Sequence, residues 1–140
     1  MSKQKEKSIV WIDGEWHEGS YPVMSAMSQS YMHGSTVFDG ARVFNNCVPD
    51  LDKHCARLLE SASVMGLKIM LNEQELVDLC IEGVKLFEKG AELYVRPSIF
   101  ADSGFLIPEP DSNKKNNTLL IIPASVEYPE KYFWGNDQKF

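Results

Sequence analysis

The sequence predicts an α+β fold in which two main helices pack on a mainly antiparallel sheet. Three observations lead to this prediction. A two-residue turn, Asp13-Gly14, separates two short apolar segments, which is typical of a β-hairpin. Two segments of helical periodicity follow, over residues 50–66 and 72–90. Apolar strands over 91–100 and 118–123 come last, and hairpin connections between strands favour antiparallel pairing.

The length and composition suit one folded domain. The chain has 140 residues, and 44% of them are hydrophobic, which is enough for a packed core. We expect the α+β domain to cover residues 9–123. A mobile, lysine-rich tail is predicted over 1–8. Residues 124–140 show no clear periodicity and are predicted to lie outside this domain.

Charge and patterning exclude several classes of protein. The net charge of −6 argues against nucleic-acid binding, which usually requires a basic face. No apolar segment approaches the length of a membrane span, and no apolar signal-peptide core follows the N-terminus. The three cysteines are odd in number and lack metal-ligand spacing. We therefore expect a cytoplasmic protein with reduced thiols and no metal site.

The segment before the first helix is punctuated by glycines. Residues 28–35 are polar, and a strand is predicted over 36–44. Gly34 and Gly40 mark positions where the backbone needs a positive φ or a close approach by another group. Asn45-Asn46 is a turn signal, which predicts a second hairpin with a short return strand through Val48.

The first predicted helix has Asp50 as its candidate N-cap and ends at Gly66. Arg57 lies beside the apolar stripe, so its side chain can reach along the edge of the packed face. On pattern alone, Arg57 is an ordinary surface arginine. The stripe consists of Leu51, Cys55, Leu58, Ala62 and Met65.

The second predicted helix begins with a capping box formed by Asn72 and Glu75. Gly90 is its predicted C-cap glycine. In the strand that follows, Tyr94 and Arg96 are two residues apart and therefore face the same side of the sheet, away from the helices. Pro97 predicts an edge position or a bulge for this strand. The long polar segment 104–117 is typical of a lid or a partner contact.

Three segments resemble motifs of one enzyme family, in the same order and with fitting spacing. His-Gly-Ser-Thr-Val-Phe-Asp-Gly-Ala-Arg-Val-Phe, residues 33–44, resembles the "YGxxVFEGxR" segment of class IV aminotransferases. Residues 51–62 resemble the "HxxRLxxSA" helix of that family, and residues 94–100 resemble its "YxRPxxF" strand. Within the family, the resemblance favours branched-chain aminotransferases.

The resemblance implies a fold-type IV N-terminal domain and pyridoxal 5'-phosphate as cofactor. By matching positions, Arg57 contacts the cofactor phosphate, a role that suits the several fixed donors of a guanidinium. Phe38 and Tyr94 line the substrate pocket, and Arg96 holds the substrate carboxylate or supports the pocket. His33 occupies a substrate-side position where the family usually has tyrosine. Part of each pocket in the family comes from a neighbouring subunit, which implies a homo-oligomer.

The family's catalytic lysine lies in a second domain, beyond the last position of this sequence. None of the eleven lysines here falls at a matching position, so we expect no catalytic residue in this chain. Residues 124–140 are then the start of the connection to that domain, and the fragment alone is expected to be inactive. The expected substrates are an amino acid and a 2-oxo acid.

The sequence leaves other functions open. Within the family, D-amino-acid aminotransferase, amine transaminase and aminodeoxychorismate lyase are alternatives. Outside it, the chain is a candidate for a stand-alone domain that binds a small anion or forms dimers without catalysis.

Overall fold

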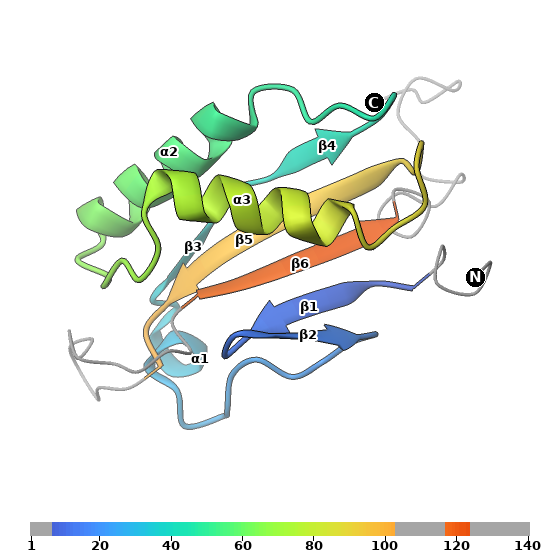
Figure 1. Ribbon diagram of the computed structural model, residues 1–140. Coiled ribbons are helices and arrows are strands. Elements are labelled where there is room, and N and C mark those ends of the chain that lie inside the picture. Colours follow the sequence, from blue (N-terminus) through green and yellow to red (C-terminus); the bar gives the residue numbers. More distant parts are fainter. Residues whose placement is uncertain (1–6, 103–116, 124–140) are drawn as a thin grey trace, which may run out of the picture.

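In the part of the chain that the structure describes, a six-stranded sheet forms one layer, and helices α2 (Leu51–Val64) and α3 (Glu73–Val84) cover one of its faces (Figure 1). The computed structural model describes residues 7–102 and 117–123. Most of the predicted tail, the segment 104–116 and residues 124–140 lie outside this part. The elements in chain order are β1 (Ile9–Ile12), β2 (Glu15–Glu18), α1 (Gln29–His33), β3 (Thr36–Phe38), β4 (Ala41–Val43), α2 (Leu51–Val64), α3 (Glu73–Val84), β5 (Leu93–Phe100) and β6 (Asn117–Pro123).

All strand pairs in the sheet are antiparallel, which confirms the predicted fold class. The strand order is β2-β1-β6-β5-β3, and β4 pairs with β5 beside β3. The predicted β1–β2 hairpin is present, with Ile12 opposite Glu15 across the Asp13-Gly14 turn. β6 lies between β1 and β5, so the late strand joins the first hairpin to the rest of the sheet.

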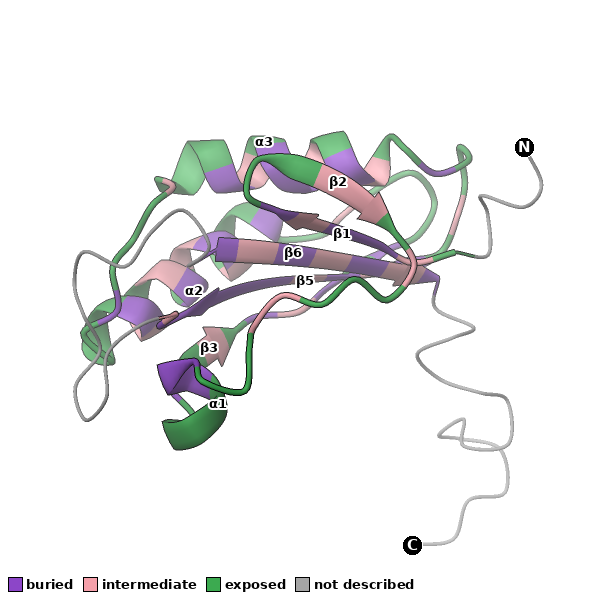
Figure 2. Ribbon diagram, turned by 90° about the horizontal axis from the view of Figure 1, so that it is seen from below, coloured by how far each residue is buried: buried purple, intermediate pink, exposed green. Residues whose placement is uncertain are grey.

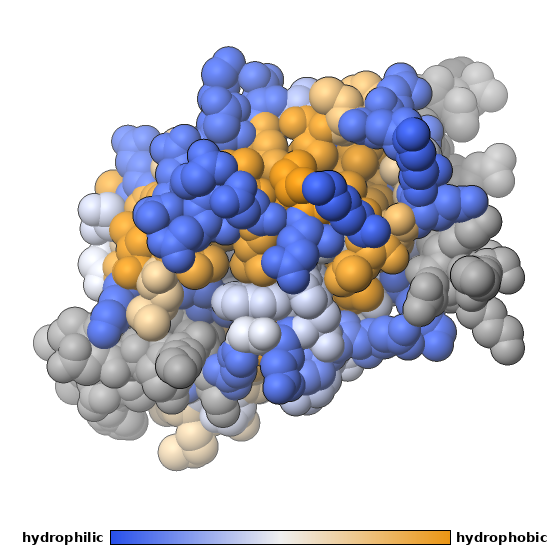
Figure 3. All heavy atoms as spheres, viewed as in Figure 1, coloured by the Kyte–Doolittle hydropathy of each residue, from blue (hydrophilic) through white to orange (hydrophobic). Residues whose placement is uncertain are grey.

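Helices α2 and α3 lie on the core side of the sheet (Figure 2). Buried side chains from both helices pack on alternate residues of the central strands. The principal ones are Leu58, Ala62, Leu76, Cys80, Leu93, Val95, Ile99, Leu119 and Ile121. Apolar surface remains visible between hydrophilic side chains on this face (Figure 3).

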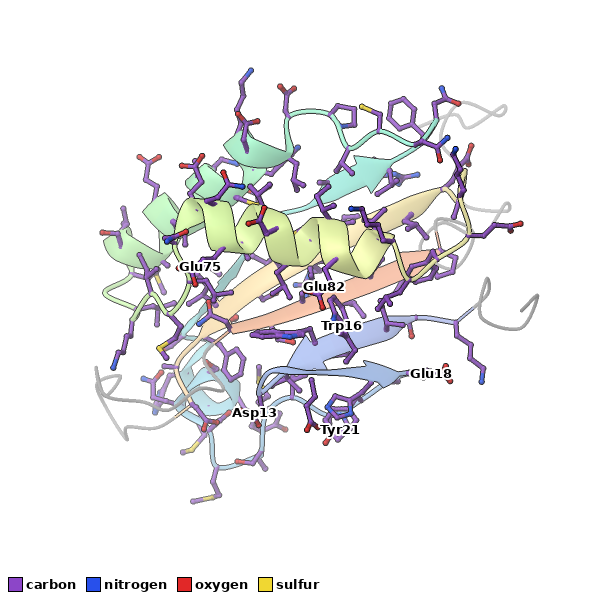
Figure 4. All side chains as sticks on the ribbon, viewed as in Figure 1. Asp13, Trp16, Glu18, Tyr21, Glu75 and Glu82 are labelled. Atoms are coloured by element: carbon purple, nitrogen blue, oxygen red, sulfur yellow. The ribbon has the colours of Figure 1, made fainter. Side chains whose placement is uncertain are left out.

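Gly83 lies on the face of α3 that packs on the sheet. A Cβ built at this glycine would overlap the side chains of Trp16 and Ile121. The Trp16 ring extends from β2 toward α3, where its Nε1–H donates to Oε1 of Glu82 at 3.1 Å (Figure 4). The glycine is therefore required by packing rather than by its backbone angles.

Tyr94 and Arg96 face away from the helices, as predicted, because their neighbours Leu93 and Val95 are buried on the core side. We call the face that carries Tyr94 and Arg96 the open face. Helix α1 lies on this side of the sheet (Figure 2). Within the described residues, no helix is long and apolar enough to cross a bilayer.

The prediction of an edge position or a bulge at Pro97 is wrong, because β5 is flanked on both sides and its register against its neighbours is unbroken. Pro97 is opposite Leu119 of β6 and accepts a hydrogen bond from the Asp39 N–H at 3.2 Å on its other side. Pro97 has no N–H to donate back to the Asp39 carbonyl. The predicted continuous strand over 36–44 is accordingly interrupted at Asp39-Gly40, although β3 and β4 keep the same register against β5.

Several predicted helix and strand ends also differ. Asp50 makes no side-chain cap and has a φ of 55°; its carboxylate instead pairs with Lys53 at 3.1 Å. The Asn72 capping box is confirmed, but α3 ends at Val84, and Gly90 terminates a later turn with a φ of +87°. The expected return strand through Val48 is reduced to one bridge between Phe44 and Cys47.

Helix α1 was not predicted, since it has only five residues. Ser28 caps its first turn, and Gly34 ends it in the left-handed conformation. The hydroxyl of Ser30 lies 2.6 Å from the Ser35 carbonyl and 2.7 Å from that of Ala101. These contacts fix α1 and the start of β3 against the end of β5.

Candidate functional site

Asp39 is the centre of a group of charged side chains at the β3–β4 interruption. Its side chain is buried, with 6% of its surface exposed. Oδ2 accepts from Arg57 Nε at 2.6 Å, and Oδ1 accepts from Arg57 Nη2 at 2.8 Å. Oδ1 also lies 2.7 Å from His54 Nδ1 and accepts from the Gly40 N–H at 2.9 Å. Four donor contacts therefore satisfy this buried carboxyl group.

These contacts determine the ionisation of Asp39. Burial raises its pKa, but hydrogen bonds from Arg57, His54 and the Gly40 N–H outweigh that effect. The pKa of Asp39 is lower than its ordinary value as a result. Because an ionised carboxylate can only accept, His54 carries a hydrogen on Nδ1 and donates it to Asp39.

Arg57 projects from the edge of α2, where its pattern placed it. The side chain is 65% exposed, in contrast to the buried carboxylate that it contacts. Only Nε and one Nη2 donor are used by Asp39. Within the described residues, Nη1 makes no hydrogen bond, so the outer edge of the guanidinium is available to an anion.

Phe38 and Arg96 stack on the open face. The Arg96 guanidinium carbon lies 4.0 Å from the centre of the Phe38 ring, and the ring is 53% exposed. Tyr94 lies over Gly40, because a Cβ built at Gly40 would come within 2.7 Å of the tyrosine hydroxyl and ring. The structure therefore groups three predicted site residues, Phe38, Tyr94 and Arg96, around Gly40.

The two groups lie on opposite faces of the sheet and meet at its edge. Asp39 and Arg57 are on the core side, whereas Phe38 and Tyr94 are on the open face. β3 and β4 form the outer strand at this end of the sheet. The two groups therefore flank the same edge of the sheet, with Gly40 and the overlying Tyr94 ring between them.

His33 comes from a separate element of the fold. It is exposed at the end of α1, on the open side of the sheet. The hydroxyl of Ser30 fixes the helix that carries it. The structure thus places His33 on the same side as Phe38 and Arg96, whereas the group around Gly40 is built from β3 and β5.

The pairing of Asp39 with Arg57 and His54 was not predicted from the sequence. Asp39 lies inside the recognised motif, but its burial depends on tertiary packing. His54 is three residues before Arg57, so both side chains lie on one side of α2. That spacing is the signal that predicts a shared partner.

Three hollows of the described surface lie elsewhere. One groove of about 310 Å³ lies between β4 and the end of α3, where Val43, Val84 and Leu93 line it. Two others, of about 250 and 330 Å³, adjoin β2 and the connection after it. None of the three contains a predicted site residue. We place the site at the sheet edge, because charged groups converge there. Among the described residues, no three metal-ligating side chains come together.

Comparisons with known proteins identify the family. The family model for amino-transferase class IV matches residues 36–133. The chain belongs to this family. The matched region contains β3, β4, α2 and β5, and with them Phe38, Arg57, Tyr94 and Arg96.

Relatives of this class IV aminotransferase chain are themselves named aminotransferases. A probable branched-chain-amino-acid aminotransferase of Rickettsia bellii is 31% identical over 140 residues, which cover 96% of this chain and 46% of that protein. An aminotransferase structure from Brucella abortus, bound to PLP, is 35% identical with a TM-score of 0.79 and covers 84% of this chain and 42% of that one. The structure of a branched-chain aminotransferase from Thermoproteus uzoniensis with norvaline is 28% identical, with a TM-score of 0.68. The match covers 84% of this chain and 41% of that one.

The chain spans less than half the length of these relatives. The structures match it in their N-terminal part, which confirms the predicted fold-type IV N-terminal architecture.

Proposed function

We propose that this chain is the N-terminal domain of a pyridoxal-phosphate-dependent aminotransferase. The complete enzyme transfers an amino group between a branched-chain or related amino acid and a 2-oxo acid. One observation carries the proposal: an accessible guanidinium edge at Arg57 and the pocket wall of Phe38, Tyr94 and Arg96 meet at Gly40 on one sheet edge. The names of the relatives support the reaction class.

The residues at this edge fit the cofactor. Arg57 keeps N–H groups available for a phosphate while Asp39 holds the rest of the guanidinium. Gly40 lets the Tyr94 ring pack directly on the backbone, which holds this aromatic surface close to the edge that carries Arg57. When bound, the cofactor supplies the electron sink that amino-group transfer requires.

The open face suits an amino-acid substrate. Arg96 offers donors for a carboxylate, and stacking on Phe38 fixes the plane of its guanidinium. Phe38 and Tyr94 present aromatic surface to the substrate side chain. His33 replaces the tyrosine that is usual in the family, and it contributes a substrate-side contact from α1.

The remaining parts of the enzyme lie outside this domain. We assign residues 1–8 to a tail, 9–123 to the domain and 124–140 to the start of the connection to a second domain, which carries the catalytic lysine. The fragment alone is inactive, and the enzyme works as a cytoplasmic homo-oligomer.

The test uses the complete natural protein, purified without added cofactor. Titration with pyridoxal 5'-phosphate, followed by absorbance, should show saturable binding. Incubation with L-leucine or L-valine and a 2-oxo acid should then exchange the amino group, and D-alanine should be a poor donor. Activity with D-amino acids alone would disprove the branched-chain assignment. A complete protein that binds no cofactor would instead support a stand-alone binding or dimerisation domain.

A further inference from the structure

We propose that Asp39 is a positioning residue for the cofactor phosphate, which it serves by fixing the orientation of Arg57. His54 secures Asp39 in the same arrangement. This inference rests on the proposed function and adds two residues to it. Neither residue contacts the phosphate in this proposal; both act through the arginine.

The division of donors on Arg57 supports the assignment. A guanidinium has five N–H groups in a rigid plane. Asp39 receives two of them, from Nε and Nη2, in a two-point contact that sets the plane of the group. Both N–H groups of Nη1 remain on the outer edge. An exposed arginine would otherwise sample many rotamers, so this pairing prepares the outer edge for binding before the phosphate arrives.

Asp39 is itself held firmly. Its backbone N–H donates to the Pro97 carbonyl at 3.2 Å, which fixes it against the central strand. Its Oδ1 receives the Gly40 N–H and the Nδ1–H of His54, at 2.9 and 2.7 Å. The carboxylate therefore has one position relative to the sheet, and it transmits that position to Arg57.

Charge and geometry predict opposite effects at this site. Asp39 adds a negative charge close to the expected phosphate, so its charge alone weakens phosphate binding. Its geometry strengthens binding by holding Arg57 in place. Replacing the carboxylate with a neutral amide of the same shape, Asp39→Asn, therefore distinguishes a bystander from a positioning residue.

The experiment compares two ligands in the complete protein. Pyridoxal 5'-phosphate carries the phosphate, and pyridoxal lacks it. We expect Asp39→Asn to weaken pyridoxal 5'-phosphate binding about tenfold or more, as is typical when a hydrogen bond to a charged group is removed, and to leave pyridoxal binding unchanged. Asp52→Asn, a change in an exposed acid of α2, is the matched control and should alter neither affinity.

A double-mutant cycle with Arg57→Ala completes the test. If Asp39 acts through Arg57, Asp39→Asn has no further effect once Arg57 is removed. Unchanged or tighter pyridoxal 5'-phosphate binding in Asp39→Asn would overturn the inference, as would fully additive losses. If Arg57→Ala itself has no effect, the proposed phosphate role of Arg57 fails instead.

Thermal unfolding shows whether Asp39→Asn is folded. Asp39→Glu provides a second variant, because it keeps the carboxylate and places at position 39 the glutamate of the "YGxxVFEGxR" motif. It should therefore bind pyridoxal 5'-phosphate more tightly than Asp39→Asn does. An affinity no better than that of Asp39→Asn would contradict the positioning role.

Discussion

Arg57 and Asp39 form a two-point contact in which Nε and Nη2 donate to the two carboxylate oxygens at 2.6 and 2.8 Å. The Arg57 side chain is 65% exposed, whereas the Asp39 side chain is only 6% exposed. This contact links α2 to the interrupted outer strand of the sheet. It thereby couples the proposed cofactor site to the stability of the domain.

The lowered pKa of Asp39 predicts how that stability depends on pH. A carboxyl group with a depressed pKa in the folded state stabilises the fold at pH values above its unfolded pKa, which is near 3.8. This contribution is lost as the pH falls through the lower, folded pKa. When denaturant unfolding is measured from neutral pH into this acid range, the free energy of unfolding should fall more steeply for the wild type than for Asp39→Asn. Parallel curves for the two proteins would show that Asp39 is not the titrating group.

Gly83→Ala should destabilise the domain by about 1–3 kcal/mol, because the added methyl group has no room beside Trp16 and Ile121. Helix propensity alone favours alanine, so a loss of stability isolates the packing effect. Ser63→Ala, at an exposed position of α2, serves as the control and should be nearly neutral. The comparison is made by urea unfolding. A stabilised Gly83→Ala variant would mean that α3 can move away from the sheet without cost.

Gly40→Ala should displace the Tyr94 ring, since the new Cβ would lie 2.7 Å from its hydroxyl. In the complete enzyme, we expect kcat/KM for the amino donor to fall about a hundredfold, the scale of a small misplacement in an active site. The same substitution in a Tyr94→Ala background should have a smaller additional effect. Equal effects in both backgrounds would indicate that Gly40 acts on the cofactor rather than on Tyr94.

The three thiols should differ in reactivity. Cys47 is exposed, whereas Cys55 and Cys80 are buried between α2 and α3. Contact with Cys55, together with burial, raises the pKa of the Cys80 thiol. A thiol-reactive dye should therefore label Cys47 rapidly in the native protein and the other two only after denaturation. Cys47→Ser should abolish the rapid phase, and rapid labelling that persists in this variant would show that the helix pair opens.

Local patterns in the sequence predicted much of this fold. The Asp13-Gly14 turn, the capping box at Asn72 and the alternation of Leu93 and Val95 with Tyr94 all depend on neighbouring residues. Each was confirmed, because the information needed lies within a few positions. The recognised motifs assigned Phe38 and Arg96 to one substrate pocket, which stays a prediction, and in the structure the two side chains stack.

The features that sequence patterns missed depend on long-range contacts. Pro97 was expected at an edge or a bulge, but its missing N–H coincides with the Asp39-Gly40 interruption, which makes a central position tolerable. The burial of Asp39 and its contact with His54 arise only when α2 packs against β3. Helix α1 is too short for a periodic signal, and Ser30 holds it through a carbonyl at the far end of β5.

The position of β6 has a consequence for synthesis of the protein. β6 lies between β1 and β5, and Trp11 pairs with Leu119 across more than a hundred residues of chain. The first hairpin leaves the ribosome early, but its place in the sheet is created only when residues 117–123 follow. Until then, the hairpin has an unpaired edge. Newly made chains that stop before β6 should therefore be sensitive to proteases and should depend on chaperones, however well their helices form.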